Sequence, residues 1–502
     1  MVRLLRLVIP AMFAVSAVAI APPASADHNA DEHSDNMSLV SATPNATGAV
    51  NSDLAFWGDR AYAGNYDGFR IFDISDPASP ELLTDFRCFG PQNDPVVWEN
   101  RLLFLTIDRT LAGPDCGSPA VAHDDPNGWE GVRIFDVSNP RSPKFIKAVY
   151  TDCGAHTITA FPKNPAHLML YVSSYPLRPG PTCGQVRGPE AGRDPLHGVI
   201  QVIDVPVNNP KAAKEVAEPP VVYPGDPDNQ FVWAEHGLPG PPAFEPAARA
   251  CHDIAVFVEL GLAAGACAEQ GQLWRIKPNG IPDTANPIWT FDDQVDETGT
   301  TGDPDDPGVV VDFFHSATFS WDGEVVNFID ESFADVEGQC PPTTPAGAPI
   351  GGDSGRMFFL DAATGAKLSH FMADRPAEND YCSAHMGLPV PTTDGTRLIV
   401  NAWYLGGINV VDFTDPTNPV EVAFYDAAPP GPAGSDNWSA YWYEGPKLGG
   451  DSLTIYATDG VHDPAAVQAA GRGFDVFRVD GLSTDVSFDH LNPQTQEQLI
   501  GG

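Results

Sequence analysis

Apolar and polar residues alternate in short segments along most of the chain, and the alternation has a period of two. This period is typical of β-strands that bury one face, because successive side chains of a strand point to opposite sides of the sheet. Long stretches with the 3.6-residue period of an amphipathic helix are missing from the sequence. We therefore expect an all-β protein.

One version of the alternating pattern recurs seven times. Each copy starts with glycine, continues through alternating apolar residues, and in most copies ends in a turn rich in Asp, Asn and Pro. The clear copies are GFRIFDISDPASP from Gly68, GVRIFDVSNPRSP from Gly131, GVIQVIDVPVNNP from Gly198 and GGINVVDFTDPTNP from Gly406, and the weaker copies start at Gly271, Gly355 and Gly473. Two apolar segments precede each copy and a short strand follows most of them. Four short strands repeated seven times predict a seven-bladed β-propeller.

The two ends of the repeat array complement each other. No clear fourth strand follows the seventh copy, whereas the segment Met37–Pro44 precedes the first unit and belongs to none. We expect this segment to pair with the last blade and close the ring, because an open ring would leave strand edges exposed. Residues 37–502 would then form a single propeller domain.

The N-terminus has the pattern of a secretory signal. Arg3 and Arg6 precede the apolar run from Leu7 to Ala21, and Ala24-Ser25-Ala26 is a small-residue cleavage site. We expect residues 1–26 to be a signal peptide and residues 27–36 to be an acidic, disordered leader. The later sequence has no apolar run of about 18 residues, so we predict a secreted protein without a membrane span.

The charge balance argues against two anionic partners. Asp and Glu number 67 against 27 Lys and Arg, which gives a net charge of −40. Nucleic acids and anionic membrane surfaces bind basic patches, so neither is expected as a partner. We expect a monomer that binds a small molecule or another extracellular ligand.

Eight cysteines, an even number, accompany the signal sequence. This combination predicts disulfides, and the lack of any C-x-x-C pair argues against a zinc knuckle. We expect sequential pairing, including a Cys251–Cys267 bond between two strands joined by a turn near Gly261.

The repeats resemble those of the LVIVD-repeat proteins over nearly the whole mature chain. The segments that carry the resemblance include SDLAFWGDRAYAGNYDGFRIFDISDP, CHDIAVFVELGLAAGAC, FHSATFSWDG, CSAHMGLPVP and AWYLGGINVVDFTDPTNPVE. The resemblance implies a propeller but no particular activity, because propellers host many functions.

Histidines recur at one position of the repeat. When the first strands of the seven units are aligned, one column holds Ser52, Asn93, His156, His252, His315, His385 and Trp438. The first strand of a blade lies nearest the axis, so equivalent positions form a ring around the channel. Imidazole is the commonest metal ligand among side chains. We therefore predict that His156, His252, His315 and His385 bind a divalent transition metal, copper or zinc.

Acidic residues stand next to this column. The following position holds Asp53, Asp94 and Asp253, and Asp330 and Glu331 end the second strand of the fifth unit. Carboxylates so placed can orient histidines or transfer protons. Asp253 and Glu331 are the predicted catalytic residues.

Other interpretations of the histidine column remain open. A polar residue repeated at one level can join neighbouring blades by hydrogen bonds, or the ring can form a metal-free binding or catalytic site. Two functions therefore follow from the sequence: a metal-dependent hydrolase or oxidoreductase, or a non-enzymatic binding or scaffold protein outside the cell or on its surface.

Overall fold

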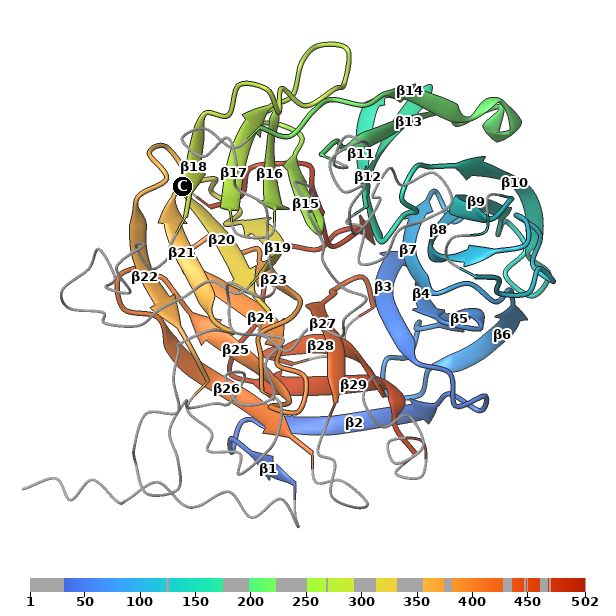
Figure 1. Ribbon diagram of the computed structural model, residues 1–502. Helices are drawn as coiled ribbons and strands as arrows, with labels where there is room; N and C mark the ends of the chain where they lie inside the picture. Colours follow the sequence, from blue (N-terminus) through green and yellow to red (C-terminus); the bar gives the residue numbers. More distant parts are fainter. Residues whose placement is uncertain are drawn as a thin grey trace, which may run out of the picture.

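The computed structural model describes residues 31–501 except 123–124, 126, 175–197, 223–250, 268–269, 293–312, 332–354, 374–381, 428–435, 447, 449, 461–467 and 469–470. The expected signal peptide, residues 1–26, lies outside this range. Seven antiparallel sheets surround a central axis (Figure 1), which confirms the seven-bladed β-propeller.

The strands of each blade follow one another from the axis outward. The first three blades consist of β3 (Asn51–Trp57), β4 (Arg60–Asn65), β5 (Gly68–Asp73) and β6 (Glu81–Arg87); β7 (Gln92–Trp98), β8 (Leu102–Leu111), β9 (Trp129–Asp136) and β10 (Lys144–Tyr150); and β11 (Thr157–Asn164), β12 (His167–Ser173), β13 (Gln201–Pro206) and β14 (Lys214–Ala217). The short 3-10 helix η2 (Pro210–Ala212) precedes β14.

The remaining blades repeat this order. The fourth to sixth blades consist of β15 (Asp253–Phe257), β16 (Leu262–Cys267), β17 (Gln270–Arg275) and β18 (Trp289–Phe291); β19 (Phe314–Phe319), β20 (Val325–Asp330), β21 (Met357–Asp361) and β22 (Lys367–Phe371); and β23 (Gly387–Val390), β24 (Leu398–Ala402), β25 (Ile408–Asp412) and β26 (Val420–Asp426). The seventh contains β27 (Asn437–Trp442), β28 (Ser452–Asp459) and β29 (Gly473–Asp480).

The outer strand of the seventh blade comes from the other end of the chain. Strand β2 (Met37–Pro44) runs antiparallel to β29, with Met37 opposite Val479 and Pro44 opposite Gly473. Strand β2 therefore covers the edge of β29, for which the sequence showed no clear fourth strand after the seventh copy.

In the first two blades the recurring glycine lies at or near the start of the third strand, where the backbone approaches the fourth strand closely. Gly68 and Gly131 have φ angles of 148° and 141°. A Cβ atom on Gly68 would lie 1.9 Å from the Phe86 carbonyl oxygen, and one on Gly131 would lie 2.2 Å from that of Val149. Only glycine fits both the φ angle and the space at these positions.

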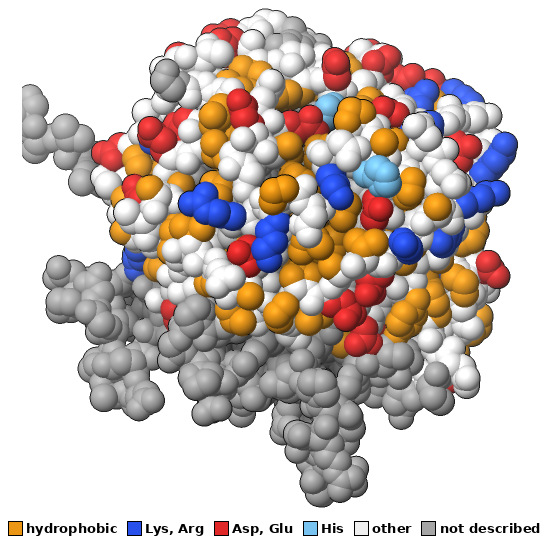
Figure 2. Space-filling model, turned by 90° about the horizontal axis from the view of Figure 1, so that it is seen from above, with side chains coloured by type: hydrophobic (Ala, Val, Ile, Leu, Met, Phe, Trp, Pro, Cys, Tyr) orange, Lys and Arg blue, Asp and Glu red, His pale blue; other side chains and the backbone are white. Residues whose placement is uncertain are grey.

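The hydrophobic core lies between neighbouring blades. Val96, Phe104 and Ile134 of the second blade, for example, form one buried cluster with Ile158, Leu170 and Ile203 of the third. The alternating apolar residues of the sequence thus fill the space between facing sheets. Over the face seen in Figure 2, acidic and basic side chains are interspersed with apolar ones.

The acidic segment before β2 is partly ordered, although the sequence predicts disorder for residues 27–36. Glu32–His33 form strand β1, which pairs with β26 of the sixth blade. The Tyr425 hydroxyl donates to Oδ2 of Asp31 over 2.6 Å, and the His33 ring stacks on Tyr425 at 5.5 Å. The aromatic contacts and the strand pairing hold this short stretch against the sixth blade.

Disulfides join neighbouring segments as the sequence predicts. Cys88 is bonded to Cys116 and Cys251 to Cys267. Cys153 and Cys382 are disulfide-bonded as well. Within the described residues, no helix has the length and apolar character needed to cross a membrane.

The C-terminal segment after β29 crosses one end of the channel, an arrangement that the repeat pattern did not reveal. Its short strands β30 (His490–Leu491) and β31 (Thr495–Gln496) pair with β3 and β15, the innermost strands of the first and fourth blades. Between them Asn492 exchanges two hydrogen bonds with the Val97 backbone, and the Thr495 hydroxyl donates to the Ala160 carbonyl. In Figure 1 this segment is the red trace that crosses the centre of the ring.

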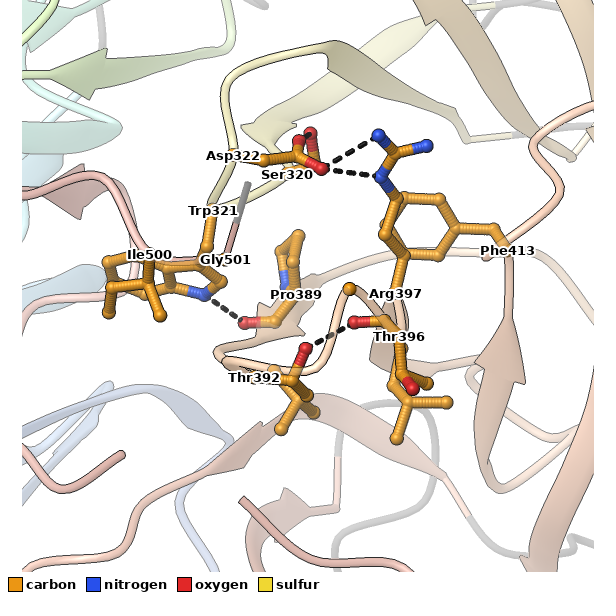
Figure 3. A pocket seen from close by; sticks show the side chains of 13 residues that line it. Ser320, Trp321, Asp322, Pro389, Thr392, Thr396, Arg397, Phe413, Ile500 and Gly501 are labelled. Carbon is orange, nitrogen blue, oxygen red and sulfur yellow. Dashed lines mark hydrogen bonds and ion pairs between the residues drawn. The ribbon is translucent and has the colours of Figure 1, made fainter. Parts of the chain in front are cut away.

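The same segment ends between the fifth and sixth blades. The Ile500 amide donates to the Trp321 carbonyl over 2.9 Å. Ile500 and Gly501 line a shallow pocket there, where the Trp321 indole donates to the Pro389 carbonyl and Arg397 pairs with Asp322 at 2.7 Å (Figure 3). The C-terminal segment thus contacts the inner strands of five consecutive blades and the edge of the sixth.

We predict that Gln496→Ala lowers the free energy of unfolding by about 2–4 kcal/mol. The Gln496 side chain accepts from the Phe319 amide and donates to the Phe319 carbonyl, so its loss leaves two buried backbone groups without partners. Urea denaturation measures the change. Gln498→Ala, at an exposed position of the same segment, should change the value by no more than about 0.5 kcal/mol. Equal effects of the two substitutions would contradict the prediction.

Candidate metal centre

The four histidines of the repeat column stand side by side at the start of the inner strands of consecutive blades. The ring centroids of His156 and His252 are 4.4 Å apart, those of His252 and His315 are 3.7 Å apart, and those of His315 and His385 are 4.1 Å apart. All four are buried. The alignment of the repeats therefore identified residues that are neighbours in space.

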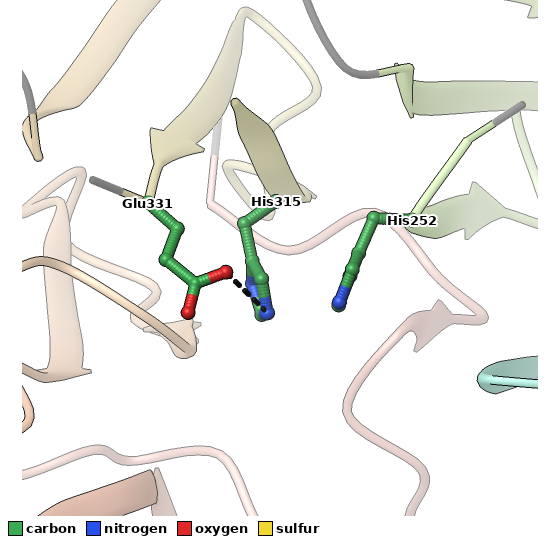
Figure 4. Close-up of side chains that lie close together, drawn as sticks. All are labelled: His252, His315 and Glu331. Carbon is green, nitrogen blue, oxygen red and sulfur yellow. Dashed lines mark ion pairs between the residues drawn. The ribbon is translucent and has the colours of Figure 1, made fainter. Parts of the chain in front are cut away.

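Two of the predicted ligands and one predicted catalytic residue form a compact donor group. His252, His315 and Glu331 each offer one ligand atom, and these three atoms lie within 4.8 Å of one another (Figure 4). His252 directly precedes β15, His315 belongs to β19, and Glu331 directly follows β20. With metal–ligand bonds of about 2.0–2.2 Å, small side-chain rotations would bring the three donors onto one ion.

Burial favours the form of histidine that binds metals. The pKa values of His252 and His315 are held well below the usual range, first by burial and then by the charges of the neighbouring histidines. Both imidazoles are therefore neutral near pH 7. Neutral imidazole is the ligand form, so no proton has to be displaced when a metal binds.

Glu331 is held in place by Tyr404, a residue to which the repeat pattern assigned no role. The Tyr404 hydroxyl donates to Oε1 of Glu331 over 2.5 Å, while Oε2 lies 3.7 Å from Nε2 of His315. Tyr404 has a φ angle of 42°, a left-handed conformation that costs a non-glycine residue on the order of 1 kcal/mol. Its ring also packs on His385, 4.4 Å between centroids.

The two outer histidines of the column have different partners. His385 donates from Nδ1 to the Trp438 carbonyl of the next blade. His156 bonds through Nδ1 to Oδ2 of Asp108 over 2.8 Å, and its Nε2 lies 3.4 Å from Nε2 of Gln92. The Tyr66 hydroxyl in turn donates to Oε1 of Gln92 over 2.9 Å.

Hydrogen bonds between blades also occur at this level, as the structural interpretation of the column expected. The Thr157 hydroxyl donates to the His252 carbonyl over 2.6 Å, and the Ser316 hydroxyl donates to the His385 carbonyl over 3.0 Å. The hydroxyl residues that follow the histidines therefore join the blades. Two of the histidine side chains also join blades: that of His385 bonds to the Trp438 carbonyl of the seventh blade, and that of His156 bonds to Asp108 of the second.

Asp253 lies apart from the donor group. Its Oδ1 accepts from the Ile254 amide over 2.8 Å, and its neighbours are Thr157, Gln494 and the carboxylates of the adjacent column. Burial, and secondarily the charge of Asp53, raises the pKa of Asp253 to about 8. Of the two predicted catalytic residues, Glu331 is the one placed beside the histidines.

Another acidic residue, Glu130, lies near Asp108, the hydrogen-bond partner of His156. Glu130 accepts a hydrogen bond from the Thr110 hydroxyl. Burial raises the pKa of Glu130 to about 7, with smaller contributions from the charges of Asp108 and Asp152. The folded protein therefore favours the protonated form of Glu130.

We predict that Glu130 makes the protein less stable as the pH rises. Its pKa is higher in the folded than in the unfolded chain, so its contribution to stability is fully present below about pH 4.5 and is lost as the pH rises through about 7. Glu130→Gln, which mimics the neutral acid, should reduce the loss between pH 5 and pH 8 by on the order of 3 kcal/mol. Chemical denaturation at a series of pH values measures this, and identical pH profiles of variant and wild type would contradict it.

Comparisons with known proteins identify the repeat. The profile of the LVIVD repeat matches residues 50–87 and 127–151. No curated protein is detectably similar in sequence. A solved structure of a putative 6-phosphogluconolactonase from Bacteroides fragilis is 12% identical over 87% of this chain and 98% of its own, with a TM-score of 0.43. The N-terminal domain of Nup159 is 8% identical over 91% and 97% of the two chains, with a TM-score of 0.42.

Proposed function

Because the chain is a seven-bladed propeller of LVIVD repeats with a buried donor group on its axis, we propose that it is a metal-dependent enzyme. Its ligands would be His252, His315 and Glu331. Their convergence within 4.8 Å is the observation that carries the proposal, because each comes from a different strand and nothing in the repeat template requires Glu331 to be there.

The donor set favours zinc and hydrolysis. Two imidazoles and one carboxylate with a further position left for water or substrate are the ligands of many catalytic zinc sites. When bound, such a metal polarises a substrate oxygen and lowers the pKa of a coordinated water. Copper or iron in the same set would support an oxidoreductase instead, which is the second candidate.

The neighbouring residues have assignable tasks in this scheme. Tyr404 holds Glu331 through its hydroxyl and so fixes the carboxylate toward His315. Asp108 holds Nδ1 of His156 and leaves Nε2 as the acceptor that Gln92 approaches. A substrate or water that replaced Gln92 at this atom could transfer its proton to His156, which makes His156 the candidate general base.

The setting proposed for this enzyme is outside the cytoplasm, acting on a small extracellular molecule. The disulfides Cys88–Cys116 and Cys251–Cys267 support export, since such bonds persist in oxidising compartments. The expected signal peptide, residues 1–26, supplies the route.

We predict that the purified protein contains about one transition-metal ion per chain, measured by elemental mass spectrometry after removal of loosely bound metal. His252→Ala, His315→Ala and Glu331→Gln should each weaken metal binding at least tenfold, because each removes one of three protein ligands. Hydrolysis of a panel of esters, lactones and phosphoesters should fall in parallel.

His167→Ala is the matched control. His167 also pairs with a carboxylate, that of Asp204 at 2.7 Å, but it lies at the start of β12 and is 40% exposed. Its replacement should leave the metal content unchanged. A wild-type protein that binds no transition metal would contradict the proposal and favour the alternative, a non-enzymatic extracellular binding or scaffold protein.

A further inference from the structure

The end of the second strand carries a polar side chain at the same position in three blades. The backbone amides of Tyr66, Asp108 and Glu331 each donate to the carbonyl that lies two residues before the aligned column of the same blade. The three residues therefore occupy equivalent positions at one end of the ring. Glu331 belongs to the candidate metal centre, and Asp108 holds His156, the proposed base. Tyr66 belongs to the same level, and it contacts a cation.

That cation is Arg109, which follows Asp108 on β8. Successive side chains of a strand point to opposite faces, so Asp108 reaches His156 of the third blade and Arg109 reaches Tyr66 of the first. The guanidinium carbon of Arg109 lies 5.7 Å from the centre of the Tyr66 ring, within the range of a cation–π contact. The Tyr66 hydroxyl donates to Gln92, and Gln92 approaches Nε2 of His156. A continuous row of contacts therefore links Arg109 to the proposed base.

The Arg109 guanidinium forms no ion pair with any described residue. Arg87 and Arg141, which are also exposed, pair with carboxylates at 2.6 and 2.5 Å. The carboxylate nearest in sequence, that of Asp108, is directed to the other face of the blade. In a chain with 67 acidic and 27 basic residues, a cation without an acidic partner is available for a negatively charged ligand.

Arg109 also lies where the site meets solvent. His252 and His315 are each 2% exposed, whereas His156 is 8% exposed and the Asp108 side chain is 19% exposed. Arg109 itself is exposed. Exposure thus rises from the donor group through the proposed base to Arg109. A molecule that enters on the side of the second blade meets the guanidinium before it reaches His156.

We propose that Arg109 binds an anionic group of the substrate, so that the enzyme acts on small molecules that carry a carboxylate or a phosphate in addition to the bond that is cleaved. A guanidinium stacked on an aromatic ring keeps its in-plane N–H donors, whose fork matches two oxygens of a carboxylate or phosphate. Tyr66 is the platform that positions the guanidinium. The inference rests on the proposed enzymatic function, because it names the substrate class of the same site.

The acidic character of the chain makes this single cation decisive. A net charge of −40 repels anions from the protein as a whole, so an anionic substrate depends on the local charge of Arg109. A neutral substrate neither gains from the guanidinium nor suffers the repulsion. Loss of Arg109 should therefore reverse the preference between an anionic substrate and a neutral one of the same shape, rather than lower both rates together.

Hydrolysis of two matched esters by the metal-loaded full chain tests the proposal. Mono-para-nitrophenyl glutarate carries a free carboxylate, and para-nitrophenyl pentanoate is its neutral counterpart. We expect the wild type to have the higher kcat/KM with the glutarate ester, through a lower KM. Arg109→Ala should lower this kcat/KM at least tenfold, because it removes a charged, two-point contact, and should leave the value for the pentanoate ester nearly unchanged. Arg109→Lys, which keeps the charge without the fork, should fall between the two.

Arg141→Ala is the matched control. Arg141 is exposed like Arg109 but pairs with Glu81, and its replacement should leave the preference between the two esters unchanged. Equal kcat/KM losses for both esters in Arg109→Ala, or a wild type that prefers the neutral ester, would overturn the inference and leave the enzymatic function standing.

Titration calorimetry on the chelator-treated full chain gives a second readout that needs neither metal nor catalysis. Monomethyl glutarate and methyl phosphate are the two probes, and the tighter one identifies the preferred anion. Arg109→Ala should weaken its binding at least tenfold, and Arg141→Ala should not. If no ester is hydrolysed but this binding depends on Arg109, the anion site is supported and the enzymatic function fails. Unchanged affinity in Arg109→Ala, or no binding of either anion by the wild type, would overturn the inference.

Discussion

Closure of the ring is the constraint on which the rest of the structure depends. Once seven sheets share one axis, residues at equivalent positions of the innermost strands must lie on one circle, and neighbours in the repeat register become neighbours in space. The contact distances along His156, His252, His315 and His385 follow directly from this geometry. The same rule puts Asp53, Asp94 and Asp253 at equivalent positions one residue further along.

Repetition explains how much of the fold the sequence could predict. In the copies that start at Gly68 and Gly131 the glycine is required by the close approach of the fourth strand, so it marks the third strand of its blade. The alternating apolar residues mark the faces that pack between blades. By contrast, the C-terminal segment occurs once and follows no template. Its role depends on side chains such as Asn492 and Gln496 that bond to distant backbones, and alternation carries no sign of this.

In the candidate site, too, the sequence could predict the residues that recur in the repeat but not the residues around them. Residues in the repeat register, His252 and His315, could be found by alignment, and Glu331 by its place at the end of a strand. The repeat alignment did not assign roles to Tyr404, Asp108 and Gln92, although Asp108 holds in the second blade the register position that Glu331 holds in the fifth. Asp253 follows His252 in the sequence, and its side chain contacts Thr157 and the Ile254 amide rather than Glu331.

The pairing of β2 with β29 and the C-terminal segment beside the inner strands both affect the order in which the chain folds. Strand β2 precedes every blade in the sequence, whereas its partner β29 and the segment that contacts the inner strands follow the first six blades. Individual blades can form during synthesis, but the axis cannot be sealed until the seventh blade and the segment after it are present. Contacts between residues so far apart in sequence form slowly. The polar groups of the channel therefore remain in water until late, and become enclosed in the same step that completes the molecule.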